Sequence, residues 1–237
     1  MKSVLRFFLC LVVLFTSLSD LAAQQFNFSQ YNFTDQRVNP ALVGIGNYWK
    51  FSGLHREQNT GPNFDIKSTA IAGSYPFVNA NDAGVFGGLG ITLLDDKAGE
   101  GKAFKVQEVG LSYAMQIKTG VRQQLALGIS GFYQTRKFDY DDLLTNSQFI
   151  PNRGFDASLN NGESFNELKR SFYRMGVGLH WENRDVNDLR TGHFGVSGFD
   201  LNRPNDAFVD TTFQTNSTLM ANAGFLLMKR GALSIYP

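Results

Sequence analysis

Residues 108–117 read EVGLSYAMQI, and every second residue of this stretch is apolar. Successive side chains of an extended strand point to opposite faces of the sheet. One face of this stretch therefore carries Val109, Leu111, Tyr113, Met115 and Ile117. The other face carries Glu108, Gly110, Ser112, Ala114 and Gln116. Such regular alternation predicts a β-strand in a sheet with one apolar and one polar face.

The same pattern returns in residues 125–134 (LALGISGFYQ) and 173–182 (YRMGVGLHWE). Aromatic residues gather near the ends of such stretches, as Trp49 and Trp181 do, which is typical of strands that meet a membrane interface. We expect eight strands and the start of a ninth. They lie near residues 47–56, 64–77, 84–94, 104–118, 122–137, 171–183, 190–201 and 213–228, and the ninth begins at Ala232. The predicted fold class is all-β.

The expected connections alternate between long and short. The long ones cover residues 55–63, 95–103, 138–170 and 202–212, and the short ones cover residues 79–83, 119–121, 183–188 and 229–231. Outer-membrane barrels have short periplasmic turns and longer outer loops. The pattern therefore predicts an antiparallel transmembrane β-barrel of the outer-membrane type, with its first strand running outward. A soluble exported β-sandwich is the alternative.

At least eight strands are visible, and the chain stops at Pro237 within what reads as the ninth. Single-chain bacterial barrels close with an even number of strands, which leaves no open edge in lipid. We therefore expect residues 47–237 to be an incomplete barrel, with more strands in the complete protein. The alternative is that residues 232–237 are only a tail.

Residues 1–23 have the three parts of a secretory signal peptide. Lys2 and Arg6 precede an apolar run, and small residues close the segment at Ala23. The run is shorter than the roughly 20 residues that a helical span needs, so cleavage is favoured over an uncleaved anchor. Residues 24–46 then form an N-terminal segment that faces the periplasm or plugs the barrel.

Charge and motif content narrow the classes of function. The net charge is +1, and basic residues form no run, so we expect no nucleic-acid partner. Cys10 is the only cysteine and falls in the predicted signal peptide. The sequence has no G-x-S-x-G, H-E-x-x-H or Cys-His metal spacing. We therefore expect no enzymatic activity, no cofactor and no metal site.

Two chemical alternatives are less favoured. Ser130 and His180 fall on the polar faces of neighbouring strands, where a hydrolase would pair them. Acidic residues within 95–96 and 139–142 would suit a hard cation at the outer rim. The ordinary interpretations are a polar face that needs such side chains and loop acids that are solvated.

Four segments carry a family resemblance. Residues 26–33 read FNFSQYNF, residues 39–44 read NPALVG, residues 55–58 read HREQ, and residues 87–99 read GGLGITLLDDKAG. In this order they resemble the PorP/SprF family of outer-membrane proteins, which is associated with type IX secretion and gliding. The resemblance covers roughly residues 26–140, whereas the long loop that follows departs from the family pattern.

The resemblance implies a scaffold in the cell outer membrane that is not an enzyme. Its implied partners are outer-membrane lipid, secreted surface proteins or adhesins, and periplasmic components of the secretion system. We expect the outer loops, above all residues 138–170, to meet the exported partner. The candidate partner-binding residues in the N-terminal segment are Phe28, Gln30, Tyr31, Asn39 and Pro40. A purely structural strand-entry segment is the alternative for these residues, and a passive diffusion porin is the alternative function.

Overall fold

The computed structural model describes most of the chain after the predicted signal peptide. It covers residues 35–61, 64–80, 84–99, 103–139, 146–156, 158–159, 168–186, 189–208, 212–230 and 233–235. The predicted signal peptide, residues 1–23, lies outside the described residues.

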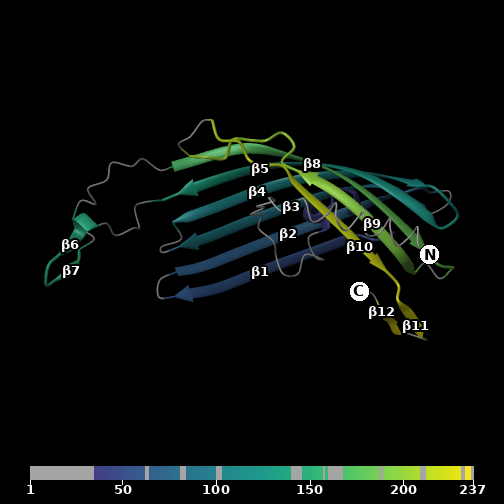
Figure 1. Ribbon diagram of the computed structural model, residues 1–237, viewed down its shortest axis with the longest axis horizontal. Coiled ribbons are helices and arrows are strands. Elements are labelled where there is room, and N and C mark those ends of the chain that lie inside the picture. Colours follow the sequence, from purple (N-terminus) through teal and green to yellow (C-terminus); the bar gives the residue numbers. More distant parts are fainter. Residues whose placement is uncertain are drawn as a thin grey trace, which may run out of the picture.

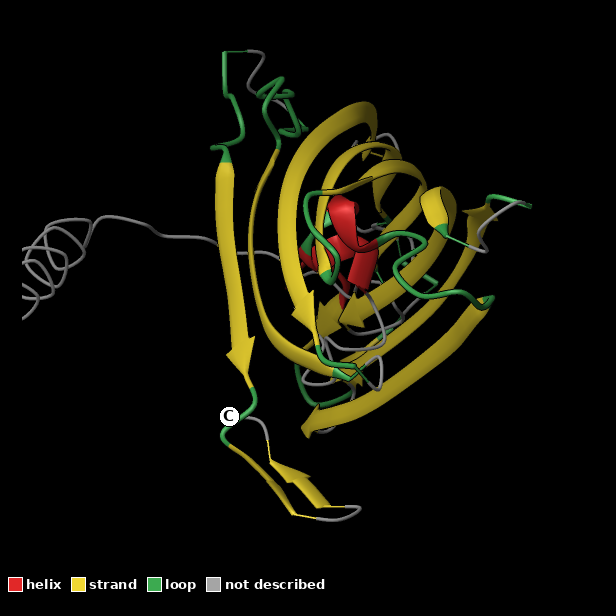
Figure 2. Ribbon diagram, turned by 90° about the vertical axis from the view of Figure 1, so that its right-hand side faces the viewer, coloured by secondary structure: helices red, strands yellow, loops and turns green. Residues whose placement is uncertain are grey.

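The main element is an eight-stranded antiparallel sheet in which each strand pairs with the next along the sheet. Its strands, in order, are β1 (Lys50–Gly61), β2 (Phe64–Val78), β3 (Val85–Gly99), β4 (Phe104–Lys118), β5 (Gln123–Phe138), β8 (Leu168–Arg184), β9 (Arg190–Phe199) and β10 (Thr218–Phe225). Figure 1 shows these strands side by side, and Figure 2 shows that the sheet curls into a half-barrel.

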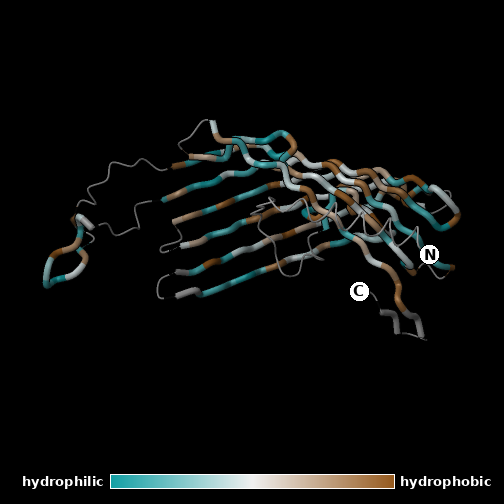
Figure 3. Tube along the Cα trace, viewed as in Figure 1, coloured by the Kyte–Doolittle hydropathy of each residue, from teal (hydrophilic) through white to brown (hydrophobic). Residues whose placement is uncertain are grey.

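The convex face of the sheet is apolar and open. In β4, the outward side chains from Val109 to Ile117 are between 42% and 58% exposed, whereas the side chains between them are buried on the concave face. The same split runs through β3, β5 and β8, and Figure 3 shows the alternation of hydropathy along these strands. So large an uncovered apolar face suits contact with lipid.

The outward apolar residues lie in register across the strands and form what we call the apolar band. We call the end of the sheet with the predicted long loops the outer end. The row of the band nearest to this end contains Ile71, Leu93, Val109, Tyr133 and Tyr173, and the row nearest to the opposite end contains Ile117, Leu125 and Trp181. At about 3.4 Å per residue, the distance along β4 from Val109 to Ile117 is about 27 Å. A strand tilt of about 40° reduces this length to about 21 Å along the membrane normal, which is comparable with the band of about 25 Å that surrounds outer-membrane barrels.

The prediction of an all-β, antiparallel sheet of the barrel type is confirmed. The predicted loops at 55–63 and 95–103 are wrong, because β1 continues to Gly61 and β3 to Gly99. These outer strand ends carry polar residues on both faces, so the alternation that indicates a strand is missing there although the backbone stays paired. The contrast between long and short connections therefore fails in the first two pairs.

Two long connections remain at the outer end of the sheet. The one between β5 and β8 contains the short helix η4 (Asn146–Gln148) and a small hairpin formed by β6 (Phe149–Ile150) and β7 (Gly154–Phe155). Figure 1 shows this hairpin beyond the ends of the main strands. The other long connection lies between β9 and β10.

The end of the described chain differs from the prediction of a long eighth strand. The predicted strand 213–228 is shortened to β10, which ends at Phe225. A short strand β11 (Met228–Arg230) follows and pairs with β12 (Leu233–Ile235), in a hairpin separate from the main sheet. The predicted ninth strand therefore corresponds to β12, which does not extend the barrel wall.

Within the part of the chain that the structure describes, no helix has both the length and the apolar character needed to cross a membrane.

We expect the Leu111→Arg variant to be strongly destabilised in a bilayer. Leu111 is 58% exposed on the convex face, inside the apolar band, and a cation at such a position costs about 2–4 kcal/mol near the bilayer midplane. The matched control is Val121→Arg, because Val121 is fully exposed in the β4–β5 turn. Refolding into lipid vesicles from urea would measure both unfolding free energies. Equal losses in the two variants would contradict a lipid-facing band.

Candidate functional site

A short helical segment lies inside the curl of the sheet, against its concave face. It consists of the helix α2 (Asp35–Val38), the 3-10 helix η2 (Pro40–Leu42) and the residues that lead to β1. Figure 2 shows it, in red, enclosed by the strands. Asn39 and Ala41 have no exposed surface, and Val43 is 1% exposed. We call residues 35–46 the inner segment.

The floor beneath the inner segment is a row of small residues. Direct pairing across five adjacent strands aligns Gly88, Ala114, Gly128, Gly178 and Ser197. All of them occupy concave positions, so the wall has almost no side-chain volume at this level. The row lies near the middle of the apolar band, because Ala114 falls between Tyr113 and Met115.

The inner segment fills the space that this floor leaves free. A Cβ atom on Gly128 would collide with the backbone of Pro40 and Ala41, and a Cβ atom on Gly178 would collide with Asn39. Gly88 faces Gly44, whose Cα atom lies 2.6 Å from the position of such a Cβ atom. Gly44 also has a φ of +71°, a conformation that suits glycine. Backbone therefore packs on backbone at Gly88 and Gly128, and the Asn39 side chain packs on the backbone at Gly178, so larger residues at these positions would separate the segment from the wall.

The Asn39-Pro40-Ala41 sequence makes the central contact. The Asn39 side-chain oxygen accepts a hydrogen bond from the Ala41 backbone N–H at 2.9 Å, which caps η2. Its amide nitrogen donates to the backbone oxygens of Leu179 and Val196, at 3.0 and 3.3 Å. Pro40 occupies the first turn of η2, where no backbone N–H is needed. The motif thus caps a turn and clamps it to β8 and β9.

Further polar contacts tie the inner segment to the remaining strands. The Gln36 side chain donates to the Gly73 oxygen of β2 at 2.8 Å, and Gln116 of β4 donates to the Val43 oxygen at 3.3 Å. The Ser197 hydroxyl of β9 donates to the Val38 oxygen at 2.5 Å. Lys50, the first residue of β1, forms an ion pair with Asp35. Together with the glycine contacts, these bonds connect the inner segment to every strand from β1 to β9 in the main sheet.

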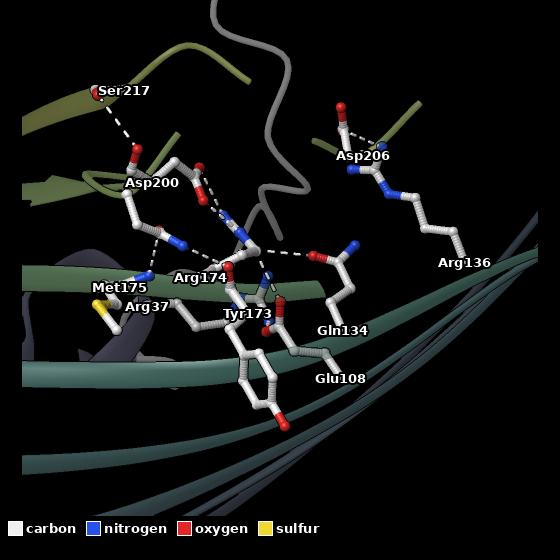
Figure 4. A network of polar contacts seen from close by, with 11 residues as sticks. Arg37, Glu108, Gln134, Arg136, Tyr173, Arg174, Met175, Asp200, Asp206 and Ser217 are labelled. Atoms are coloured by element: carbon white, nitrogen blue, oxygen red, sulfur yellow. Dashed lines mark hydrogen bonds and ion pairs between the residues drawn. The ribbon is translucent and has the colours of Figure 1, made fainter. Parts of the chain in front are cut away.

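An ionic cluster lies on the concave face toward the outer end. Glu108 of β4 accepts from Arg37 of the inner segment at 2.5 Å and from Arg174 of β8 at 2.8 Å. Arg174 also donates to both carboxylate oxygens of Asp200, at 2.5 and 2.9 Å, and to the Gln134 side chain at 3.2 Å. Figure 4 shows Arg174 at the centre of these contacts. Two carboxylates therefore neutralise two guanidinium groups in a mostly buried network.

This cluster also holds the start of the β9–β10 connection against the wall. Asp200 has a φ of +57°, an uncommon value for a residue other than glycine. The next residue, Leu201, donates its N–H to the Met175 oxygen at 3.2 Å, and Arg136 forms an ion pair with Asp206. The connection thus folds back over the mouth of the half-barrel instead of extending away from it.

A second buried charge lies at the opposite end of the concave face. Glu182 is 1% exposed and pairs with Arg184 at 2.8 Å and with Arg190 at 3.2 Å. His180 lies beside it, and the His180 and His193 rings are 5.6 Å apart between centroids. Among the described residues, no group of three His, Cys, Asp or Glu side chains is arranged to hold a metal ion.

The structure separates the residues of the hydrolase alternative. Ser130 pairs with Gly176, whereas His180 pairs with Ala126, four residues further along each strand. At about 3.4 Å per residue, the two side chains start at least about 14 Å apart. They therefore do not form a nucleophile–base pair.

The acidic residues that would form the alternative cation site do not point to one place. Asp95 points outward and pairs with Lys97 at 2.8 Å, whereas Asp96 is buried on the concave face and accepts a hydrogen bond from Ser68. Asp139 pairs with Lys137 at 3.2 Å. Residues 140–142 lie outside the described residues, so that part of the alternative stays a prediction.

The predicted partner-binding residues divide into two groups. Asn39 and Pro40 are buried, and their contacts described above are made with the protein's own wall. Phe28, Gln30 and Tyr31 lie outside the described residues. That these residues bind a partner stays a prediction.

Sequence reasoning missed the ionic cluster. The alternation places Glu108 and Arg174 on the polar faces of their strands, and a charge on the concave face of a barrel wall is a signal that a partner is needed. No local pattern links them to Arg37 of the helix α2, 71 residues before Glu108, or to Asp200 of the β9–β10 connection, 26 residues after Arg174.

One comparison with known proteins gives a match. The family model described as "Type IX secretion system membrane protein PorP/SprF" matches residues 20–237. No curated protein and no solved structure matches the chain.

We expect the Gly128→Val variant to displace the inner segment. The new side chain would occupy the space of Pro40 and Ala41, and overpacking of this kind costs about 1–3 kcal/mol. Hydrogen exchange of residues 36–44 in the folded protein would report the change as faster exchange. The matched control is Gly131→Val in the same strand, where a Cβ atom meets nothing within 4 Å. Unchanged protection in Gly128→Val would show that the glycine floor is not needed for docking.

We expect the Arg174→Gln variant to lose about 3 kcal/mol of unfolding free energy or more, because it removes the guanidinium partner of the buried Asp200 carboxylate and leaves Glu108 with Arg37 alone. The control is Arg170→Gln, on the same face of the same strand, where the guanidinium contacts, among the described residues, only the Asn205 oxygen at 3.4 Å. Denaturant titration in the same lipid would compare the two. A loss in Arg170→Gln as large as in Arg174→Gln would contradict a specific role for the cluster.

Proposed function

The chain belongs to the PorP/SprF family of type IX secretion system membrane proteins, and we propose that it is an outer-membrane scaffold that holds a secreted surface protein or adhesin. The family is a secretion-system membrane family and not a known enzyme family. In this proposal the predicted signal peptide exports the chain, the barrel fixes it in the outer membrane, and contacts at the two ends of the wall join the exported partner to the secretion and gliding machinery.

The observation that carries the proposal is the occupied concave face. A passive porin needs an open polar lumen through which solutes diffuse. Here the concave face is covered at mid-band by Asn39, Pro40 and Ala41, which pack without a gap on the glycine floor. A wall that is tied to its own N-terminal segment on every strand from β1 to β9 is better suited to a rigid support than to a channel.

The outer end of the wall offers the surface for the exported partner. By the rule that long loops lie outside, the β5–β8 and β9–β10 connections face the cell exterior. The β6–β7 hairpin carries Phe149 and Phe155, which are 47% and 54% exposed and stack edge-to-face with centroids 5.2 Å apart. Exposed aromatic pairs are frequent anchors in protein interfaces. We assign capture of the exported partner to this hairpin.

The N-terminal side is assigned to periplasmic contact. Phe28, Gln30 and Tyr31 precede the inner segment in the chain. The burial of Asn39 and Pro40 favours an anchoring role for these two residues, so we assign partner binding to the three residues before them. Within residues 24–46, the residues that anchor the segment to the wall and the residues that bind the partner would then be different.

We expect the Phe149→Ser/Phe155→Ser variant to lose its secreted partners while keeping its periplasmic ones. Loss of two interface aromatics weakens a complex roughly tenfold or more. The measurement is affinity purification of the full-length protein from outer membranes, with quantitative mass spectrometry of the eluate. The matched control is Phe213→Ser, an exposed phenylalanine of the β9–β10 connection.

Two results would contradict the scaffold. Full retention of secreted proteins by the double variant would show that the β6–β7 hairpin does not capture the exported partner. Steady ion conductance of the purified wild-type protein in planar bilayers, with no partner recovered from the membrane, would favour the passive porin.

A further inference from the structure

A row of lysines crosses the convex face just beyond the apolar band. Direct pairing between neighbouring strands aligns Lys67 of β2, Lys97 of β3, Lys105 of β4, Lys137 of β5 and Lys169 of β8. No bulge interrupts the pairing between these positions. We call these five residues the lysine row.

All five side chains point away from the concave face. The side chains of Lys67, Lys97, Lys105 and Lys137 are between 31% and 36% exposed, and Lys169 is exposed. Their neighbours along each strand, such as Val106 and Asp96, are buried on the concave side. The lysine row therefore shares a face with the apolar band.

The row lies at the level expected for lipid head groups. One polar row, with Thr69, Asp95, Gln107, Thr135 and Ser171, separates it from the apolar band. Lys105 precedes Val109 by four residues, or about 14 Å along the strand, and a strand tilt of about 40° reduces this to about 10 Å along the membrane normal. A long lysine side chain reaches back toward the interface from such a position.

The protein itself neutralises the row only in part. Lys67 pairs with Glu57 at 2.5 Å, Lys97 with Asp95 at 2.8 Å, and Asp139 is shared between Lys137 at 3.2 Å and Lys105 at 3.8 Å. Within the part of the chain that the structure describes, three carboxylates thus contact four of the five lysines. One more acid, Asp65, lies two residues before Lys67 on the same strand. Among the described residues, Lys169 forms no ion pair, so its end of the row is the more positive one.

Direct opposition of like charges destabilises a sheet, so five aligned lysines favour additional negative charge from outside the protein. Neighbouring strands are about 4.8 Å apart, which lets two adjacent ammonium groups reach one phosphate. The opposite end of the same face shows no such row, since Gln123 pairs there with Asn183. The basic row is therefore confined to the end that has the long connections.

We propose that the lysine row binds the phosphorylated head groups of lipids in the outer leaflet. The assignment rests on the orientation given under the proposed function, in which the long connections face the exterior. Each phosphate bridges lysines of adjacent strands, and the acyl chains lie along the apolar band below. The row thereby fixes the height of the wall in the membrane.

The experiment titrates the purified full-length protein, in zwitterionic detergent, with bis-phosphorylated lipid A and measures bound lipid by native mass spectrometry. The variant Lys97→Gln/Lys105→Gln/Lys137→Gln should bind at least roughly tenfold more weakly. The control Lys118→Gln/Arg122→Gln/Arg153→Gln removes the same charge from exposed positions outside the row and should bind as the wild type does. Dephosphorylated lipid A, tested on the wild type, should bind as weakly as lipid A does to the row variant.

Unchanged affinity in the row variant, or an equal loss in the control variant, would overturn the proposal. Undiminished binding of dephosphorylated lipid A would also overturn it, without any change to the protein. If 10 mM inorganic phosphate abolished the difference between the two lipids, the row would be a site for free phosphate and the lipid assignment would be wrong. None of these measurements uses a secretion partner, so a negative result for lipid binding would leave the test of partner capture by the β6–β7 hairpin unaffected.

Discussion

The inner segment approaches the strand backbones so closely that no strand side chain larger than hydrogen fits at Gly88, Gly128 or Gly178. Gly88, Gly128 and Gly178 leave room for Gly44, Pro40 and Asn39, and the remaining contacts follow from that fit. Asn39 reaches the carbonyl groups of two strands only because the floor beneath it has no side chains. Close packing of the inner segment on the concave face thus depends first on the missing side-chain volume of the floor, and the hydrogen bonds follow from it.

Charge is placed on the two faces of the wall in different ways. On the concave face, Glu108 and Arg174 are mostly buried, and each finds partners of opposite sign within the protein, as a low dielectric requires. On the convex face, lysines stand in line beyond the apolar band, where water and head groups screen them. The same strands therefore carry buried ion pairs between protein groups on the concave face and solvent-exposed lysines on the convex face.

The sequence predicted the alternating parts of the wall well, because period-two hydropathy reports directly which face is apolar; residues 108–117 and 173–182 lie as expected. It missed the outer ends of β1 and β3, where Gln58 and Lys97 remain paired although neither face is apolar. It also missed the docking of Arg37 and Asn39. The hydropathy pattern shows that one face of the sheet carries polar or small side chains. Which segment covers that face depends on shape and on hydrogen-bond partners more than a hundred residues away in the chain.

The span in sequence of the inner segment's contacts has a consequence for folding order. Asn39 bonds to Leu179 and Val196, and Val38 bonds to Ser197, across separations of 140 to 159 residues. The segment is synthesised before every strand, yet its binding surface is complete only once β8 and β9 have joined the sheet. Contacts of such long range form late because the intervening chain must first be ordered. Full docking of the inner segment therefore reports that the later strands are in place, because a wall that lacks β8 and β9 offers only the contacts of β1 to β5.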